Sequence, residues 1–233
     1  MFFWLFILIT RSWGPIFHQV VASQFADEYL SHLTNDQKLA FIHGSVFIDG
    51  LPKKKYHNLS NLIPLLKNYN SNTSVEYWYI MGFILHMTAD SVGHIGPPLS
   101  YLPPKSPLHH FAELTVCSTI LRAYNPPKLI HYKISENVYQ KVVGKSSKLF
   151  SILYKAWRFI ASFPFYLYLS SIENDSCKNI CTSKYAMCNL ELHMEAIKGL
   201  MFDSLLLINE GKFTNEILGK IVIKELSRKQ CCV

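Results

Sequence analysis

One stretch of this chain of 233 residues carries three side chains with the types and spacing of metal ligands. His86, Asp90 and His94 recur at intervals of four residues, and successive members lie about 40° apart on one face of a helix. The rest of the stretch is rich in Tyr, Ile, Met, Phe and Leu. Burying an aspartate in such surroundings costs several kcal/mol unless a cation or strong donors compensate. The pattern therefore favours a metal site over the alternative, a histidine satisfied within the core.

A second pair of candidate ligands, His109 and Glu113, follows at the i, i+4 spacing by which one helix face presents two ligands to a single ion. His110 is a rival to His109, and a surface contact between histidine and glutamate is the ordinary alternative. Upstream, Asp49 and His57 lie in or beside a segment that reads as an irregular loop, where side chains are free to turn inward.

The N-terminus offers a further possible ligand. The apolar run Phe2 to Ile9 is too short to span a bilayer, and residues 1–12 are predicted to be a secretory signal peptide, with an apolar N-terminal helix or a signal anchor as the alternative. Cleavage after Ser12 would make Trp13 the first residue of the mature chain. A free α-amino group has a pKa of about 8, so it binds a metal at little cost near neutral pH. His18 follows five residues later.

Composition predicts one secreted domain, residues 13–233. Apolar residues make up 49% of the chain and charged residues 17%, which indicates a compact core rather than a disordered chain. The formal charge of +7 favours anionic partners such as membrane surfaces or nucleic acid, without choosing between them. Three glycosylation sequons, at Asn58, Asn72 and Asn174, and six cysteines that could form disulfides agree with a location outside the cell or in the lumen of the secretory pathway.

The elements that must position these residues are helical throughout, because no segment shows the alternation of a strand. Prolines predict loops at Gly96–Pro107 and after Tyr124, and Asp49 to Asn61 and Asn174 to Cys181 are also predicted to be loops. Helices are predicted at Pro15 to about Ser31, Lys38–Phe47, Ser60–Tyr69, Val75–His94, Pro107 to about Tyr124, and, as two or three helices, within Ser135–Leu169 and Met187–Leu226.

The ordered set of candidate ligands resembles the trinuclear zinc superfamily. This superfamily comprises bacterial phospholipase C, the metal domain of glycosylphosphatidylinositol-specific phospholipase D and the fungal single-strand nucleases. The resemblance covers residues 13 to about 115, and it implies an all-α, single compact multi-helix domain of that type. The set that carries it is Trp13, His18, Asp49, His57, His86-x3-Asp90, His94 and His109-x3-Glu113.

The resemblance implies three zinc ions. The first would be bound by Asp49, His57, His86 and Asp90. The second would be bound by Trp13, His18 and a bridging Asp90. The third would be bound by His94, His109 and Glu113. Asp49 is implied in addition as a base on the attacking water.

The function implied is that of a metal-dependent phosphodiesterase, most similar to phospholipase C or to the glycosylphosphatidylinositol phospholipase. The order Gly82-x3-His86-x3-Asp90, with His94 four residues later, resembles the phospholipases, whereas the spacing from Trp13 to His18 is that of the nucleases. Phospholipid or a membrane surface is therefore the expected substrate. A single-strand nuclease acting on nucleic acid and a non-catalytic zinc-binding relative are the alternatives, and no protein partner is expected. The run Lys53-Lys54-Lys55 is expected near the mouth of the cleft, or simply in solvent.

Overall fold

The computed structural model describes residues 15–48, 51, 53–69, 73–95, 136–144, 152 and 183–228. Within these ranges the chain forms helices and no strand, so the all-α prediction is confirmed there. The phospholipase C or nuclease type of fold stays a prediction. The elements, in chain order, are α2 (Pro15–Tyr29), α3 (Asn35–Phe47), α4 (Lys53–Tyr56), α5 (Leu59–Lys67), α6 (Val75–Ile95), α8 (Glu136–Val143), α11 (Ser183–Asn209) and α12 (Asn215–Arg228).

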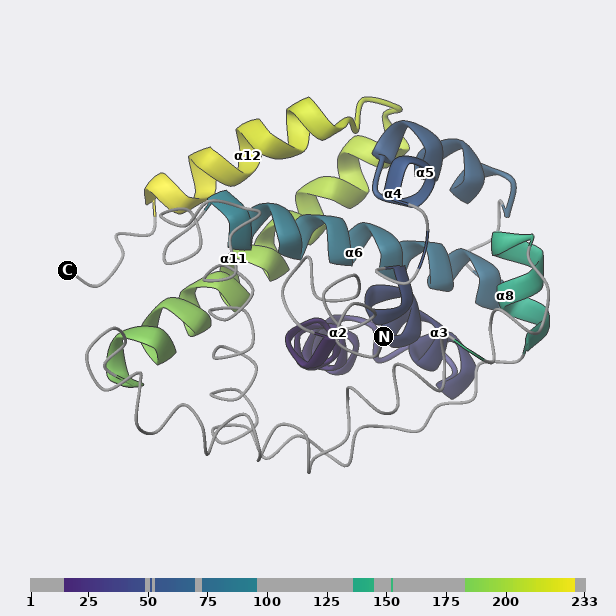
Figure 1. Cartoon of the computed structure of the whole chain (residues 1–233), viewed down its shortest axis with the longest axis horizontal. Helices are drawn as coiled ribbons and strands as arrows, with labels where there is room; N and C mark the ends of the chain where they lie inside the picture. Colours follow the sequence, from purple (N-terminus) through teal and green to yellow (C-terminus); the bar gives the residue numbers. More distant parts are fainter. Residues whose placement is uncertain are drawn as a thin grey trace.

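Helix α6 is the centre of the fold, as its apolar sequence predicts. It runs through the middle of the molecule in Figure 1, with α5 and α12 on one side, α2 and α3 on the other, and α8 beside its N-terminal end. Nearly all side chains from Trp78 to Leu85 are fully buried. A helix that is apolar on most sides must be covered on most sides, and α6 satisfies this by contacting six other helices. The candidate ligands on α6 are therefore held by a helix that the other described helices enclose on most sides.

Helix α3 begins three residues before the predicted Lys38. Thr34 forms a capping box, in which its side chain accepts from the backbone N–H of Gln37 and the Gln37 side chain accepts from the Thr34 N–H at 2.9 Å. Such a box satisfies two of the N–H groups that a helix start leaves open. Gln37 also donates from Nε2 to the carbonyl of Thr73 at 2.8 Å, which ties this end of α3 to the segment before α6.

The predicted loop from Asp49 to Asn61 is wrong in part, because it contains one helix and the start of another. Lys53–Tyr56 forms the single turn α4, and α5 begins at Leu59. Asn58 caps α5 by accepting from the Ser60 N–H at 3.0 Å, a signal that the sequence contains. Pro64 lies inside α5.

The predicted helical region Met187–Leu226 consists of two helices, with a sharp turn between α11 and α12. Gly211 has φ +71°, a conformation that favours glycine. Lys212 N–H donates to Leu207 O at 2.9 Å and Gly211 N–H to Ile208 O at 3.0 Å, the hydrogen bonds of a Schellman motif. The Thr214 side chain then accepts from Ile217 N–H at 3.2 Å and caps α12.

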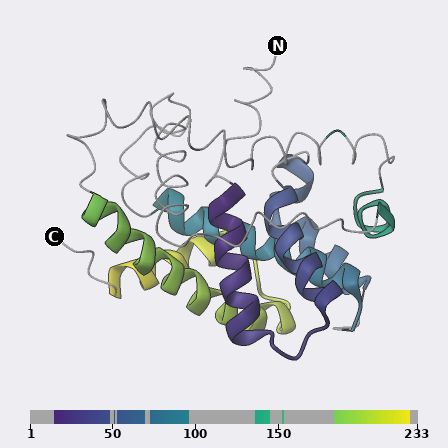
Figure 2. The ribbon, with the colours of Figure 1, turned by 90° about the horizontal axis from the view of Figure 1, so that it is seen from below.

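Buried apolar side chains from these helices form one contiguous core. The view in Figure 2 shows α2 lying between α3 and α11, and α2 contacts both. None of the described helices has the combination of length and apolar character that crossing a membrane requires. The predicted signal peptide, the loop at 96–107, the helix at 107–124 and the loop at 174–181 lie outside the described residues, as does most of 135–169 apart from α8.

Candidate metal centre

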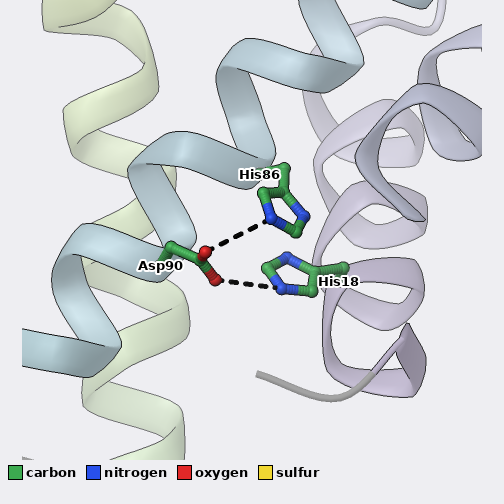
Figure 3. A group of neighbouring side chains, drawn as sticks. All are labelled: His18, His86 and Asp90. Atoms are coloured by element: carbon green, nitrogen blue, oxygen red, sulfur yellow. Dashed lines mark ion pairs between the residues drawn. The ribbon is translucent and has the colours of Figure 1, made fainter. Parts of the chain in front are cut away.

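Three of the predicted ligands meet in one place. Figure 3 shows His18 of α2 facing His86 and Asp90 of α6, with the Asp90 carboxylate directed at both imidazoles. One ligand atom from each residue can be chosen so that all three atoms lie within 4.8 Å of one another. The structure thus brings together residues from two separate helices, as a shared metal ion would require.

The two helices place these side chains for simple geometric reasons. His86 and Asp90 are one turn apart on α6, so they project from the same face. Helix α2 packs extensively on α3 and also contacts α6. His18, in the N-terminal half of α2, thereby reaches the face of α6 that carries Asp90. The His18 ring stacks on the His86 ring, with centroids 3.9 Å apart and planes 22° from parallel. The stacked pair presents two nitrogens to one carboxylate.

The contacts to Asp90 are nearly equal in length. His18 Nε2 lies 3.3 Å from Oδ1, and His86 Nε2 lies 3.3 Å from Oδ2. Both histidine side chains are fully buried, whereas 13% of the Asp90 side chain remains exposed. Burial alone would raise the pKa of Asp90, but the adjacent His86 and His18 lower that pKa well below its ordinary value. The two imidazoles therefore favour the ionised carboxylate of Asp90 in a largely buried position.

A backbone carbonyl fixes the tautomer of His86. Ser45 O lies 2.7 Å from His86 Nδ1, and since a carbonyl only accepts, Nδ1 carries the hydrogen. In neutral His86 the lone pair is then on Nε2, which faces the Asp90 carboxylate. Two lone pairs facing each other repel. Either a second proton on the ring or a cation between the atoms relieves that repulsion.

The separations fit a cation better than a proton. A hydrogen bond from an imidazolium to a carboxylate is about 2.7–2.9 Å long. Two ligand atoms about 2.1 Å from one ion, at the tetrahedral angle, are about 3.4 Å apart. Both nitrogen–oxygen distances are 3.3 Å. The donor set of two imidazoles and one carboxylate could therefore hold a divalent metal ion between the three residues.

His57 lies next to this group. It stands between α4 and α5, is partly buried, and meets the His86 ring edge to face with 5.3 Å between centroids. The resemblance groups His57 with His86, Asp90 and Asp49. The structure places His57 beside His86.

Among the other predicted ligands, His94 is the one in the described part of the chain that is not gathered with these. His94 is partly buried, one turn beyond Asp90 on α6, and is not part of the group that meets at Asp90. Trp13, Asp49, His109 and Glu113 lie outside the described residues, so each of the three predicted zinc sites is described only in part.

Sequence reasoning missed Ser45. Its contribution is a backbone carbonyl in the last turn of α3, and carbonyls there have no partner within their own helix. No residue type marks such a carbonyl. Gly44, directly before it, was the available signal, because a glycine inside a helix often indicates close packing.

Comparison of the chain with models of known protein families, with curated proteins and with solved structures finds no match.

Proposed function

We propose that this protein is a zinc-dependent phosphodiesterase resembling phospholipase C. The observation that carries the proposal is the convergence of His18, His86 and Asp90, two buried imidazoles and a largely buried carboxylate from two helices. An uncompensated carboxylate in that position would cost several kcal/mol. A cation bound between the three residues would offset that free-energy cost.

Zinc suits these ligands better than a hard cation. Imidazole nitrogen is a common zinc ligand, whereas calcium and magnesium prefer oxygen alone. In this proposal His86 would bind one ion and His18 a second, and Asp90 would be shared by both. Zinc bound there lowers the pKa of a coordinated water to about 7 and polarises a phosphoryl oxygen, which is the chemistry that phosphodiester hydrolysis needs.

The chain's own residues prepare that site. The Ser45 carbonyl holds His86 with Nε2 directed at Asp90, and an outer partner of this kind fixes the orientation of a ligand histidine. Asp90 offers one oxygen to each histidine, so it can bridge. In the full proposal, His57 and Asp49 complete one site and Trp13 a second, while His94, His109 and Glu113 form a third. Asp49 also acts as a base.

Phospholipid is the proposed substrate, in the secretory pathway or outside the cell. The order of residues from Gly82 to His94 supports it, and the formal charge of +7 agrees with an anionic substrate of either kind. Single-stranded nucleic acid is the alternative that the Trp13–His18 spacing favours. A zinc-binding relative without activity is the third possibility. Both alternatives are outcomes of the test below.

The test is to produce the secreted protein, determine its first residue, and measure bound zinc by elemental analysis. We expect about three zinc ions per chain, hydrolysis of phosphatidylcholine vesicles, and loss of zinc and activity in Asp90→Asn. Asp203→Asn, at an exposed aspartate of α11, is the matched control and should retain both. Cleavage of single-stranded DNA but not of lipid would identify the nuclease. Zinc without either activity would identify the non-catalytic relative, and one ion or none would exclude the three-zinc proposal.

A further inference from the structure

Helices α3 and α6 cross at two glycines, Gly44 and Gly82. A Cβ added to Gly82 would fall on the Phe41 carbonyl oxygen and would lie 2.8 Å from Ser45 N and 2.9 Å from Gly44 Cα. A Cβ added to Gly44 would fall on the Tyr79 carbonyl oxygen. Because Cβ atoms essentially never approach other atoms so closely, the two backbones can touch only where both residues are glycine. We call this contact the glycine crossing.

The glycine crossing is in register with the candidate metal centre. Gly82 lies one turn before His86 and two turns before Asp90, on the same face of α6. Gly44 directly precedes Ser45, whose carbonyl lies 2.7 Å from His86 Nδ1. Helix pairs are usually about 8–10 Å apart, and a pair whose backbones touch brings the carbonyls of one helix close to the side chains of the other. The crossing and this hydrogen bond therefore involve adjacent residues of α3 and the same face of α6.

Ser45 also lies beside the helix that carries His18. Its hydroxyl is 2.7 Å from Ile42 O and 3.3 Å from the backbone carbonyl of His18. Ser45 is fully buried. The last turn of α3 thus touches both helices that contribute to the group, and a shift of α3 would alter both.

We propose that Gly44 and Gly82 are positioning residues, which bring the Ser45 carbonyl to His86 and so hold the His86 ring with Nε2 toward Asp90. The expected effect on metal affinity rests on the proposed function, whereas the effect on the ring does not. A methyl group at the crossing would push α3 away from α6. The distance between His86 Nδ1 and Ser45 O would then exceed that of a hydrogen bond. Loss of an outer partner of a metal-binding histidine weakens metal binding roughly 10- to 100-fold.

The experiment compares the full-length protein with its Gly82→Ala variant. The hydrogen position on His86 is measured in zinc-free protein by long-range ¹H–¹⁵N NMR, and the affinity for Zn²⁺ alone is measured by competition with a chelator. We expect the wild type to carry the hydrogen on Nδ1. In Gly82→Ala this tautomer preference should be lost and zinc binding should weaken roughly 10- to 100-fold.

Two controls separate positioning from general damage. Gly199→Ala places a Cβ in α11 where nothing lies within 4 Å, and it should change neither readout. Val222→Ala removes buried volume from α12, and it should lower stability without changing the His86 tautomer. An unchanged tautomer and unchanged zinc affinity in Gly82→Ala would overturn the inference, as would equal changes in Val222→Ala.

The outcomes also distinguish this inference from the proposed function. A wild type that binds no zinc, but whose Nδ1–H tautomer disappears in Gly82→Ala, would refute the function and support the positioning role. If Gly82→Ala does not fold, Gly44→Ala is measured instead, because it disturbs the same crossing from the other helix. An Nε2–H tautomer in the wild type overturns the inference without any variant.

Discussion

His18 and Asp90 approach each other from different helices, with 3.3 Å between Nε2 and Oδ1. The His18 side chain is fully buried, and the second oxygen of Asp90 faces His86 at the same distance. The separation exceeds that of a charge-assisted hydrogen bond and is close to the separation of two ligands on one tetrahedral ion. This contact is therefore the place where the proposed metal site is most directly tested.

The first prediction concerns His18→Ala. Zinc at 100 times its dissociation constant should raise the unfolding free energy of the wild type by about 2.7 kcal/mol. His18→Ala removes a ligand and should abolish most of that increase, measured by urea unfolding with zinc and with chelator. His32→Ala is the control, since His32 is exposed and lies outside the group. An equal increase in wild type and His18→Ala would show that His18 is not a ligand.

The second prediction separates the two roles of the His86 ring. Asparagine at 86 can still donate to the Ser45 carbonyl from its amide but cannot reach Asp90, whereas glutamine has no donor at the Nδ1 position. In the presence of chelator, His86→Asn should be more stable than His86→Gln by about 1 kcal/mol, the value of one buried hydrogen bond. Both should bind zinc far more weakly than the wild type.

Urea unfolding in chelator measures the stability difference, and competition with a chelator measures the zinc affinity. Equal stability of the two variants would mean that the hydrogen bond between His86 and Ser45 contributes little. Wild-type zinc affinity in either variant would exclude Nε2 as a ligand.

Sequence reasoning predicted the part of the site that lies within one helix. His86 and Asp90 are one turn apart, and helical periodicity is a local property that spacing reveals. The meeting of His18 with them depends on how α2 packs against α3 and α6. Spacing alone cannot show such packing, and only the resemblance to a known family indicated it. The Ser45 carbonyl could not be predicted, because every residue has a carbonyl.

Two helix boundaries were predicted wrongly although the sequence contains local signals for them. Residues 49–61 read as a loop because of glycine, proline and three lysines, but Asn58 caps α5 and a single turn forms before it. The break between α11 and α12 also has local signals, Gly211 at the end of one helix and Thr214 as the cap of the next. The apolar pattern on both sides of the break nevertheless reads as continuous helix. Capping residues would have corrected both boundaries.

The third prediction concerns pH. His193 of α11 is 1% exposed, and burial lowers its pKa to about 4. In the unfolded chain its pKa is about 6.5, so between pH 6.5 and 4 the unfolded state binds more protons than the folded state. The unfolding free energy should therefore fall as the pH falls through this range, by about 2 kcal/mol at pH 5 from this residue alone.

His193→Gln should remove that part of the pH dependence. The measurement is urea unfolding in chelator at about pH 7.5, 6, 5 and 4.5, which covers most of the range over which His193 binds a proton on unfolding. The matched control is His32→Gln, at an exposed histidine, which should follow the wild-type curve. A His193→Gln curve parallel to that of the wild type would mean that His193 titrates in the folded protein as it does in the unfolded chain.

The fourth prediction concerns the link between α5 and α12. Asn58 Oδ1 accepts from Ser60 N–H at 3.0 Å and from Asn215 Nδ2 at 3.2 Å, while Asn215 Oδ1 accepts from Leu59 N–H at 3.1 Å. One asparagine thus caps α5 while the other joins that cap to the start of α12. Asn58→Ala should lower the unfolding free energy by about 1 kcal/mol through loss of the cap.

Asn215→Ala should cost a similar amount, about 1 kcal/mol, because it removes the acceptor of the Leu59 N–H. The double variant should cost less than the sum of the two by about 0.5–1 kcal/mol, since each asparagine acts partly through the other. Asn209→Ala, at an exposed residue of α11, is the control and should change stability by less than about 0.5 kcal/mol. Strict additivity in the double variant would mean that Asn58 and Asn215 act independently, and that the contact between α5 and α12 depends on apolar packing alone.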